Sequence, residues 1–312
     1  MVASFYNTHL STFLTRMERN MSRPAEQKEF LYTAEDFERI RTLLYQHSGI
    51  KLNDSKKEMV YTRLGRRLRA NGLKSFQDYL VRVERDQADE WDAFINSLTT
   101  NLTAFFREPH HFPILKDHVL SLRKRPIRLW CSASSTGEEA YTMAMTMVDA
   151  FGTFKPPVEI IASDIDTNVL STAQAGIYPM GRVEKLPKET LKRFFLKGSG
   201  SNEGYVQVRK ELRELISFRK LNLLDERWSI SGTFDAIFCR NVMIYLDKTT
   251  QYKILKGFVP MLEANGLLFA GHSESLHHAA DIFRLRGKTV YELASYSRLS
   301  RSATTSSHSC RT

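Results

Sequence analysis

The sequence predicts an α/β protein, in which a doubly wound domain with a small antiparallel β insertion follows an all-α domain. Three observations predict this architecture. Residues 31–108 carry apolar side chains at helical spacing and few strand signals. From Ile127 onward, short apolar runs alternate with helical segments, which is typical of a mostly parallel sheet covered on both faces. Between about 185 and 221, glycine-rich turns separate runs of alternating polarity, which indicates an antiparallel insertion.

Length and composition narrow the class of protein. The chain has 312 residues, of which 42% are hydrophobic and 26% charged, as in a folded soluble protein of two domains. It has no run of 18 apolar residues, and its start lacks the pattern of a secretory signal. Cys131, Cys239 and Cys310 lie far apart, which excludes a disulfide framework or a zinc cluster. We therefore expect a cytoplasmic protein without a metal.

The first domain is expected to contain several short helices. Residues 36–44 place their apolar side chains on one helix face, and the same rhythm continues from 59 to 68. Asn71-Gly72 should end that second helix, because Asn and Gly tolerate the conformation found just past a helix end. Residues 92–106 are expected to form one or two further helices. Residues 1–30 match no pattern and are expected to be flexible.

The second domain, 109–294, alternates strands and helices up to a closing antiparallel hairpin. The expected strands are 127–131, 158–164, 234–239 and 266–270, the expected helices are 138–151, 167–175 and 249–262, and the hairpin spans 283–293. The remainder, 295–312, is rich in Ser, Thr and Arg and is expected to be disordered.

Basic residues are concentrated in one segment. Lys51 to Lys74 contains eight Lys or Arg against two acids, which accounts for +6 of the chain's formal net charge of +10. A concentrated basic face favours an acidic partner, such as nucleic acid, a membrane surface or an acidic protein.

Small residues follow the first expected strand, where a ligand could approach the backbone at the start of a helix. Two acids at that helix start, Glu138 and Glu139, disfavour a phosphate and favour a cationic or hydroxyl-bearing ligand. A dinucleotide site would also require more glycines than the single Gly137. Thr136 and Glu139 form a capping-box pattern as well, in which Glu139 would only close the helix. Both interpretations remain open.

Polar residues also follow other strands. Asp164, at the tip of the second strand, is in the position that commonly binds ribose hydroxyls, whereas Asp166 is better suited to cap the next helix. Arg240, Asn241 and Tyr245 follow a later strand, although Tyr245 could simply be a core residue.

Three other patterns are weaker. Gly271 to Ser275 begins like a nucleophile elbow but lacks the final glycine. The pairs His110-His111 and His277-His278 point in different directions on a helix and make poor metal sites. Met143, Met145 and Met147 are interpreted as core residues rather than as part of a cofactor site.

Five blocks occur together in order, and their combination is specific although each alone is weak. They are 101–108, 135–139, 162–166, 234–245 and 266–274. Together they resemble CheR, the family of chemotaxis receptor methyltransferases, over residues 36–293.

The resemblance implies a class I methyltransferase fold, S-adenosylmethionine (SAM) as methyl donor, and receptor glutamate side chains that become γ-glutamyl methyl esters. It also implies that 31–108 is a receptor-docking domain and that 109–294 binds the cofactor. The implied cofactor contacts are Asn101, Thr103, Arg107, Glu139, Asp164, Asn222, Leu223, Arg240 and Asn241.

The same resemblance implies residue roles at the substrate. Arg107 and Tyr245 would lie nearest the transferred methyl group. The implied partner is the cytoplasmic helical bundle of a chemoreceptor. The protein is expected to act as a monomer, to bind no nucleic acid and not to insert into the membrane. The basic docking helix would carry Arg63, Arg66, Arg67 and Arg69. A loop with Gly198, Gly200 and Gly204 resembles the insertion that, in some members, holds the receptor's C-terminal peptide.

The chemistry is consistent with this assignment. A glutamate, with an unperturbed pKa near 4.3, is already ionised at neutral pH, so methyl transfer to it needs no strong base. Two other functions are rivals to this assignment. The first is a nucleic-acid methyltransferase. Enzymes of that kind that methylate amino groups usually carry Asp/Asn-Pro-Pro-Tyr/Phe after the fourth strand, where this chain has Arg240-Asn241-Val242 without a proline. A cofactor-sensing docking protein without catalysis would have lost Arg107 or Tyr245, and both are present.

Overall fold

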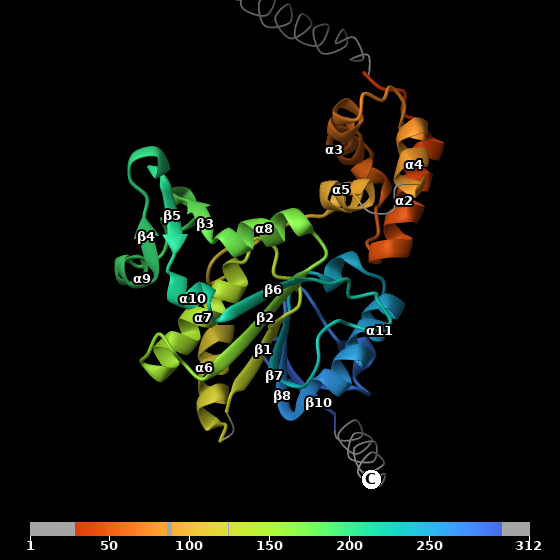
Figure 1. Ribbon diagram of the computed structural model, residues 1–312. Coiled ribbons are helices and arrows are strands. Elements are labelled where there is room, and N and C mark those ends of the chain that lie inside the picture. The colour runs from red at the N-terminus through yellow and green to blue at the C-terminus, as the bar shows by residue number, and fades with distance from the viewer. Residues whose placement is uncertain (1–28, 86–88, 124, 295–312) are drawn as a thin grey trace, which may run out of the picture.

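The computed structural model describes residues 29–85, 89–123 and 125–294 (Figure 1). The flexibility expected for residues 1–30 concerns a segment that, apart from Glu29 and Phe30, lies outside the described residues. Residues 295–312, which are expected to be disordered, lie outside the described residues as well.

The N-terminal domain is a bundle of short helices, as expected (Figure 1). Its apolar core includes Phe37, Ile40, Leu64 and Phe94, contributed by three of the helices. The second helix ends at Ala70, with Asn71 as its C-cap and Gly72 following in the left-handed conformation. The helices are α2 (Ala34–Ser48), α3 (Lys57–Ala70), α4 (Phe76–Arg85) and α5 (Asp89–Leu98), with a short 3₁₀ turn, η1 (Asp54–Lys56), before α3.

The helix expected over 92–106 is wrong in its second half. The helix α5 ends at Leu98, and residues 99–106 are irregular. Thr99 and Asn101 donate side-chain hydrogen bonds to the Asp166 carboxylate (2.8 and 2.7 Å). These polar side chains therefore fasten the linker to the second domain at the point where the helix ends.

The second domain contains a seven-stranded sheet in the order β6-β2-β1-β7-β8-β10-β9. The first five strands in this order pair in parallel, and the last two add antiparallel pairs. The strands are β1 (Ile127–Cys131), β2 (Val158–Asp164), β6 (Ile216–Lys220), β7 (Phe234–Cys239), β8 (Leu262–Ala270), β9 (Phe283–Gly287) and β10 (Val290–Leu293).

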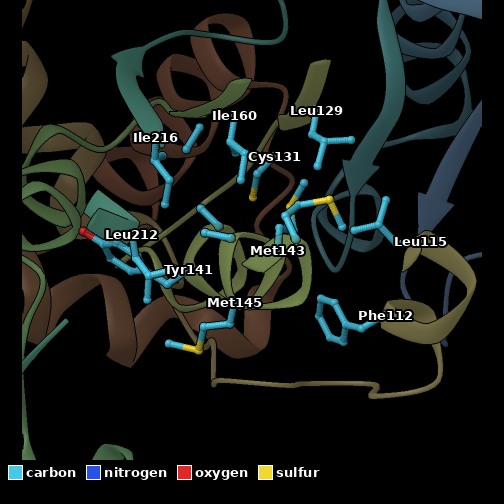
Figure 2. Close-up of a cluster of buried hydrophobic side chains, with 14 of the residues drawn as sticks. Phe112, Leu115, Leu129, Cys131, Tyr141, Met143, Met145, Ile160, Leu212 and Ile216 are labelled. Carbon is cyan, nitrogen blue, oxygen red and sulfur yellow. The ribbon is translucent and has the colours of Figure 1, made fainter. Parts of the chain in front are cut away.

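Helices cover both faces of the sheet (Figure 1). Along β1, Leu129 and Cys131 pack into one apolar cluster and Trp130 into the other, as expected for a strand buried on both sides. Figure 2 shows the first cluster, where Met143 and Met145 lie among aromatic and branched side chains, so the methionine run is core. The main covering helices are α6 (His111–Ser121), α7 (Glu138–Phe151), α8 (Thr167–Ala175) and α11 (Lys248–Phe258).

A small antiparallel sheet, with strand order β3-β5-β4, projects from the second domain (Figure 1). The expected insertion at 185–221 is correct in kind and wrong in its bounds. Its first strand begins earlier, at Ile177, and the run from Ile216 belongs to the large sheet, where it pairs in parallel with β2. Alternation of polarity did not distinguish that edge strand from a hairpin strand. The elements are β3 (Ile177–Pro179), α9 (Lys188–Phe194), β4 (Phe195–Lys197), β5 (Tyr205–Val208) and α10 (Lys210–Arg213).

The helix expected over 249–262 also ends early. The helix α11 stops at Phe258, a 3₁₀ turn follows over Val259–Met261, and Leu262 already begins β8. Pro260 explains the difference, because proline lacks a backbone N–H and disfavours helix in the residue before it.

Candidate active site

A cavity of about 240 Å³ lies at the carboxyl ends of β1, β2 and β7, with the helical domain on its other side. In an open parallel sheet, ligands bind at this edge. All ten residues predicted to contact the cofactor or the transferred methyl group line this one cavity: Asn101, Thr103, Arg107, Glu139, Asp164, Asn222, Leu223, Arg240, Asn241 and Tyr245.

Asp164 is buried at the end of β2, with a side chain held by backbone N–H groups. Ser135 and Asp166 each donate a backbone hydrogen bond to it, at 2.8 and 3.0 Å. Burial raises the pKa of Asp164 to about 6 despite these bonds. Asp166 caps α8 by accepting from the backbone of Asn168 and Val169, as the sequence predicted.

Glu139 does not close its own helix. The helix α7 is capped by Gly137, which has φ +96° and makes no side-chain cap bond. The Glu139 carboxylate instead accepts from the Arg240 guanidinium at 2.5 Å and from the Cys131 thiol at 3.2 Å. The capping-box interpretation is therefore wrong, and Glu139 belongs to the cavity.

Arg240 is the centre of a buried charge network. Its guanidinium contacts Glu139, lies 3.1 Å from Glu108, and donates to the Arg107 carbonyl at 2.6 Å. Burial would raise the pKa of Glu108, but the His272 backbone N–H and the Arg240 charge hold it below its usual value. Glu108 lies in the block 101–108, but nothing in the local sequence indicates that it would face Arg240.

Arg107 lies between two residues in the left-handed conformation, Phe106 and Glu108, each with φ +53°. Its guanidinium donates to the Leu102 carbonyl at 2.7 Å. The polypeptide is therefore sharply bent at this position. Arg107 lines the cavity, as does Tyr245, which lies in the 3₁₀ turn after β7.

The helical domain supplies one wall of the cavity, which was not predicted from the sequence. Ile50, Leu52 and Met59 line it with apolar side chains, and Lys51 and Lys56 line it with charged ones. Ile50, Lys51 and Leu52 lie in the loop after α2, Lys56 ends η1 and Met59 lies in the first turn of α3. Because all five are far from the strand ends in the sequence, no local pattern could have indicated them.

This wall is attached to the catalytic domain through the turn that carries Tyr245. The Lys51 backbone N–H donates to the Tyr245 carbonyl at 2.9 Å. The Tyr45 hydroxyl donates to Asp247 at 2.6 Å, and the Lys51 ammonium lies 3.7 Å from the same carboxylate.

The four arginines of α3 differ in their surroundings. Arg63 donates to the Thr99 carbonyl at 2.7 Å, and Arg67 pairs with the buried Glu90 at 2.7 Å. Arg69 is exposed and pairs with Glu29, which is exposed as well. Arg66 is exposed and forms no ion pair with any residue that the structure describes.

The glycines of the small sheet are required by its backbone. A Cβ on Gly198 would lie 2.0 Å from the Asn202 carbonyl oxygen, and Gly200 and Gly204 have φ values of +59° and +85°. These positions therefore shape the connection between β4 and β5.

Three possible metal ligands, Glu108, His110 and His111, bring ligand atoms within 4.8 Å of one another in the described part of the chain. The Glu108 carboxylate is shared with the Arg240 guanidinium, and His111 Nε2 lies 2.9 Å from the Lys288 carbonyl. Burial lowers the pKa of His111 to about 4. The arginine at the same carboxylate disfavours a second cation.

Within residues 29–85, 89–123 and 125–294, no helix has both the length and the apolar character needed to cross a bilayer.

Comparison with known proteins identifies both domains. Residues 35–99 match the family model "CheR methyltransferase, all-alpha domain", and residues 101–292 match "CheR methyltransferase, SAM binding domain". The chain is 52% identical over 269 residues to chemotaxis protein methyltransferase 2 of Pseudomonas aeruginosa, covering 86% of this chain and 96% of the relative. It is 54% identical over 259 residues to the chemotaxis protein methyltransferase of Escherichia coli, covering 83% and 90%. The corresponding protein of Salmonella typhimurium is 53% identical, also over 259 residues, covering 83% and 90%.

The two models together cover most of the described residues, and the cavity lies where the SAM-binding domain meets the all-α domain. The chain therefore belongs to the CheR family and is a SAM-dependent protein-glutamate methyltransferase of chemotaxis.

Proposed function

We propose that the cavity binds SAM along the ends of β1, β2 and β7, and that an acceptor glutamate of a chemoreceptor enters beside Arg107 and Tyr245. The observation that carries this proposal is the convergence of all ten predicted residues on one cavity. Nine of them are cofactor contacts, and Arg107 is shared between cofactor and substrate.

The side chains of the cavity fit SAM in their chemistry. Each Asp164 oxygen accepts one backbone N–H, which leaves further acceptor capacity for ribose hydroxyl groups. Ser132 and Ala133 are small and line the same wall, so a nucleoside has room to approach.

When bound, SAM supplies an electrophilic methyl group on its sulfonium. The protein's part is positioning, since the ionised acceptor needs no general base. Arg107 orients the acceptor carboxylate, and Tyr245 borders the site of transfer. Ile50, Leu52 and Met59 on the opposite wall exclude water.

Receptor docking is proposed for the exposed part of α3. Arg66 and Arg69 are exposed, whereas Arg63 and Arg67 are engaged inside the domain. Arg66 is therefore the docking candidate with the greatest freedom, and Arg69 would have to share its charge with Glu29. A receptor bundle that presents glutamates is the acidic partner such a face attracts.

The receptor's C-terminal peptide is proposed to bind the small sheet. Within the described residues β4 is an edge strand, and its Leu196 side chain is 46% exposed. Extended peptides add to such edges by backbone hydrogen bonds. The glycine-shaped connection between β4 and β5 supports this assignment by holding the edge in place.

The test is incubation of the full chain with methyl-labelled SAM and receptor-rich membranes, followed by mild alkali. Volatile labelled methanol from the receptor band is expected, because carboxyl methyl esters hydrolyse under these conditions. Alkali-stable label, or label on added nucleic acid, would contradict the proposal. Binding of SAM without any labelling of the receptor would contradict the proposal as well.

A further inference from the structure

Glu274 is a buried carboxylate directly behind the active site. It lies in the turn after β8 and is 4% exposed. Its Oε2 accepts the backbone N–H groups of Gly271 and Asn241, at 2.6 and 2.8 Å, and its Oε1 accepts that of Met243 at 2.7 Å. An ionised carboxylate is suited to this position because it has acceptors only. Burial raises the pKa of Glu274, and these backbone donors oppose the rise.

The backbone that Glu274 holds is sharply bent and leads to Tyr245. Asn241 has φ +60°, in the left-handed region that is uncommon for residues other than glycine. The short 3₁₀ turn Met243–Tyr245 follows at once and brings Tyr245 to the cavity. Two of the donors to Glu274 come from this segment, so the carboxylate stabilises the bend that sets the position of Tyr245.

Gly271 leaves the room that this contact needs. A Cβ at this position would lie 2.4 Å from Asn241 Nδ2 and 2.8 Å from Glu274 Oε2. The loop after β8 and the loop after β7 therefore approach each other as closely as their backbones allow.

The same turn also reaches the segment of Arg107. The His272 backbone N–H donates to Glu108 at 3.0 Å, and Asn241 Nδ2 donates to the other oxygen of Glu108 at 3.2 Å. Glu108 directly follows Arg107 in the chain. The turn from Gly271 to Glu274 is thus bonded to both segments that approach the acceptor, one through Glu274 and one through His272.

We infer that Glu274 is a positioning residue for methyl transfer, whose carboxylate fixes the loop from Asn241 to Tyr245 relative to Arg107. This inference rests on the proposed roles of Arg107 and Tyr245. A glutamine at position 274 would keep the volume but turn an NH₂ group toward a backbone N–H, so at least one of the three bonds would be lost.

The test is steady-state kinetics on Glu274→Gln, with Asp235→Asn as a matched control. Asp235 is also a buried carboxylate that accepts a backbone N–H, from Arg128 at 2.9 Å, but it lies at the opposite end of β7. We expect Glu274→Gln to lower kcat per folded molecule by about 10- to 100-fold, with the KM for SAM changed far less, because small displacements of positioned groups cost rates of this size. The control should keep its kcat per folded molecule, whatever its stability.

Gly271→Ala provides a second test, which also serves if Glu274→Gln does not fold. It should lower kcat in the same way. The double variant should be no slower than the slower single variant, because both substitutions disrupt the same contact between the Glu274 carboxylate and the loop after β7. A kcat within twofold of wild type for either single variant would overturn the inference, as would equal losses in Asp235→Asn. Tyr245→Phe distinguishes failure of this inference from failure of the proposed role of Tyr245. If it lowers kcat and Glu274→Gln does not, only this inference fails, whereas a silent Tyr245→Phe removes the proposed role on which the inference rests.

Discussion

The two walls of the cavity are built in opposite ways. The wall formed by the catalytic domain contains buried charges, with Arg240 paired to Glu139 and Glu108. The wall formed by the helical domain is apolar or exposed, and its Lys51 side chain is 60% accessible where it approaches Asp247. Buried ion pairs are costly to break, whereas exposed pairs contribute little. The first wall is thus organised before any ligand arrives, and the second is attached by weak contacts.

This difference indicates that the two walls have different roles in methyl transfer. A methyl donor must be held in line with its acceptor, which requires a rigid wall. A wall that meets a large protein partner has only to exclude water and to accept that partner at its rim. The following changes test that contrast, beginning with the one expected to have the largest effect.

Arg240→Met should have the largest effect because it leaves the buried Glu139 and the partly buried Glu108 without their cation. We expect a loss of about 3–5 kcal/mol in the free energy of unfolding, together with loss of SAM binding. Urea denaturation and calorimetry measure the two effects. The matched control is Arg193→Met, which breaks an exposed pair with Asp149 and should cost about 0–1 kcal/mol. Equal effects in the two variants would contradict the distinction between the walls.

The same contrast should appear within α3. Arg67→Ala leaves the buried Glu90 unpaired and should destabilise the protein by about 3 kcal/mol. Arg66→Ala should leave stability unchanged and raise the KM for receptor roughly two- to fivefold, more strongly at low salt than at high salt. Methylation that does not change with salt, or an Arg66→Ala variant with a normal KM, would remove Arg66 from the docking surface.

Asp164 should make SAM binding depend on pH. Its pKa is about 6, so the carboxylate takes up a proton as the pH falls through that value and loses the charge that accepts ribose hydroxyls. Affinity should be constant above about pH 7 and fall below pH 6. Asp164→Asn should bind about 10- to 100-fold more weakly at pH 8, since hydrogen bonds to charged groups are worth about 1.5–3 kcal/mol, and should show a flat pH profile. A wild-type profile that stays flat down to pH 5 would exclude this role.

The smallest effect is expected from Tyr45→Phe on the weakly attached wall. It removes the hydrogen bond to Asp247 at an exposed position and should cost about 1 kcal/mol or less in the free energy of unfolding. A loss above about 3 kcal/mol would show that this wall is as firmly built as the other.

The catalytic-domain wall was predictable from the sequence and the helical-domain wall was not. Asp164 is the last residue of β2 and Arg240 directly follows β7, and polar residues at the ends of parallel strands indicate a site. Ile50 and Met59 look like any other apolar residues of a helical domain, and only the packing of that domain over the sheet brings them to the cavity.

Two of the wrong local interpretations have the same physical origin. The run from Ile216 reads as a hairpin strand until its parallel partner in β2 is known. Thr136 and Glu139 fit a capping box in sequence, but Arg240, about a hundred residues away, attracts the carboxylate instead. In both cases a contact distant in sequence decided between two local interpretations.

The central claim is that the rigid wall holds the methyl donor while Arg107 and Tyr245 serve the acceptor. The most direct measurement compares Tyr245→Phe and Arg107→Ala with wild type in two assays, single-turnover methyl transfer to receptor membranes and calorimetric binding of the product S-adenosylhomocysteine. The account predicts a methyl-transfer rate reduced about tenfold or more in each variant, with product binding retained by Tyr245→Phe. Unchanged transfer rates with intact product binding would contradict it.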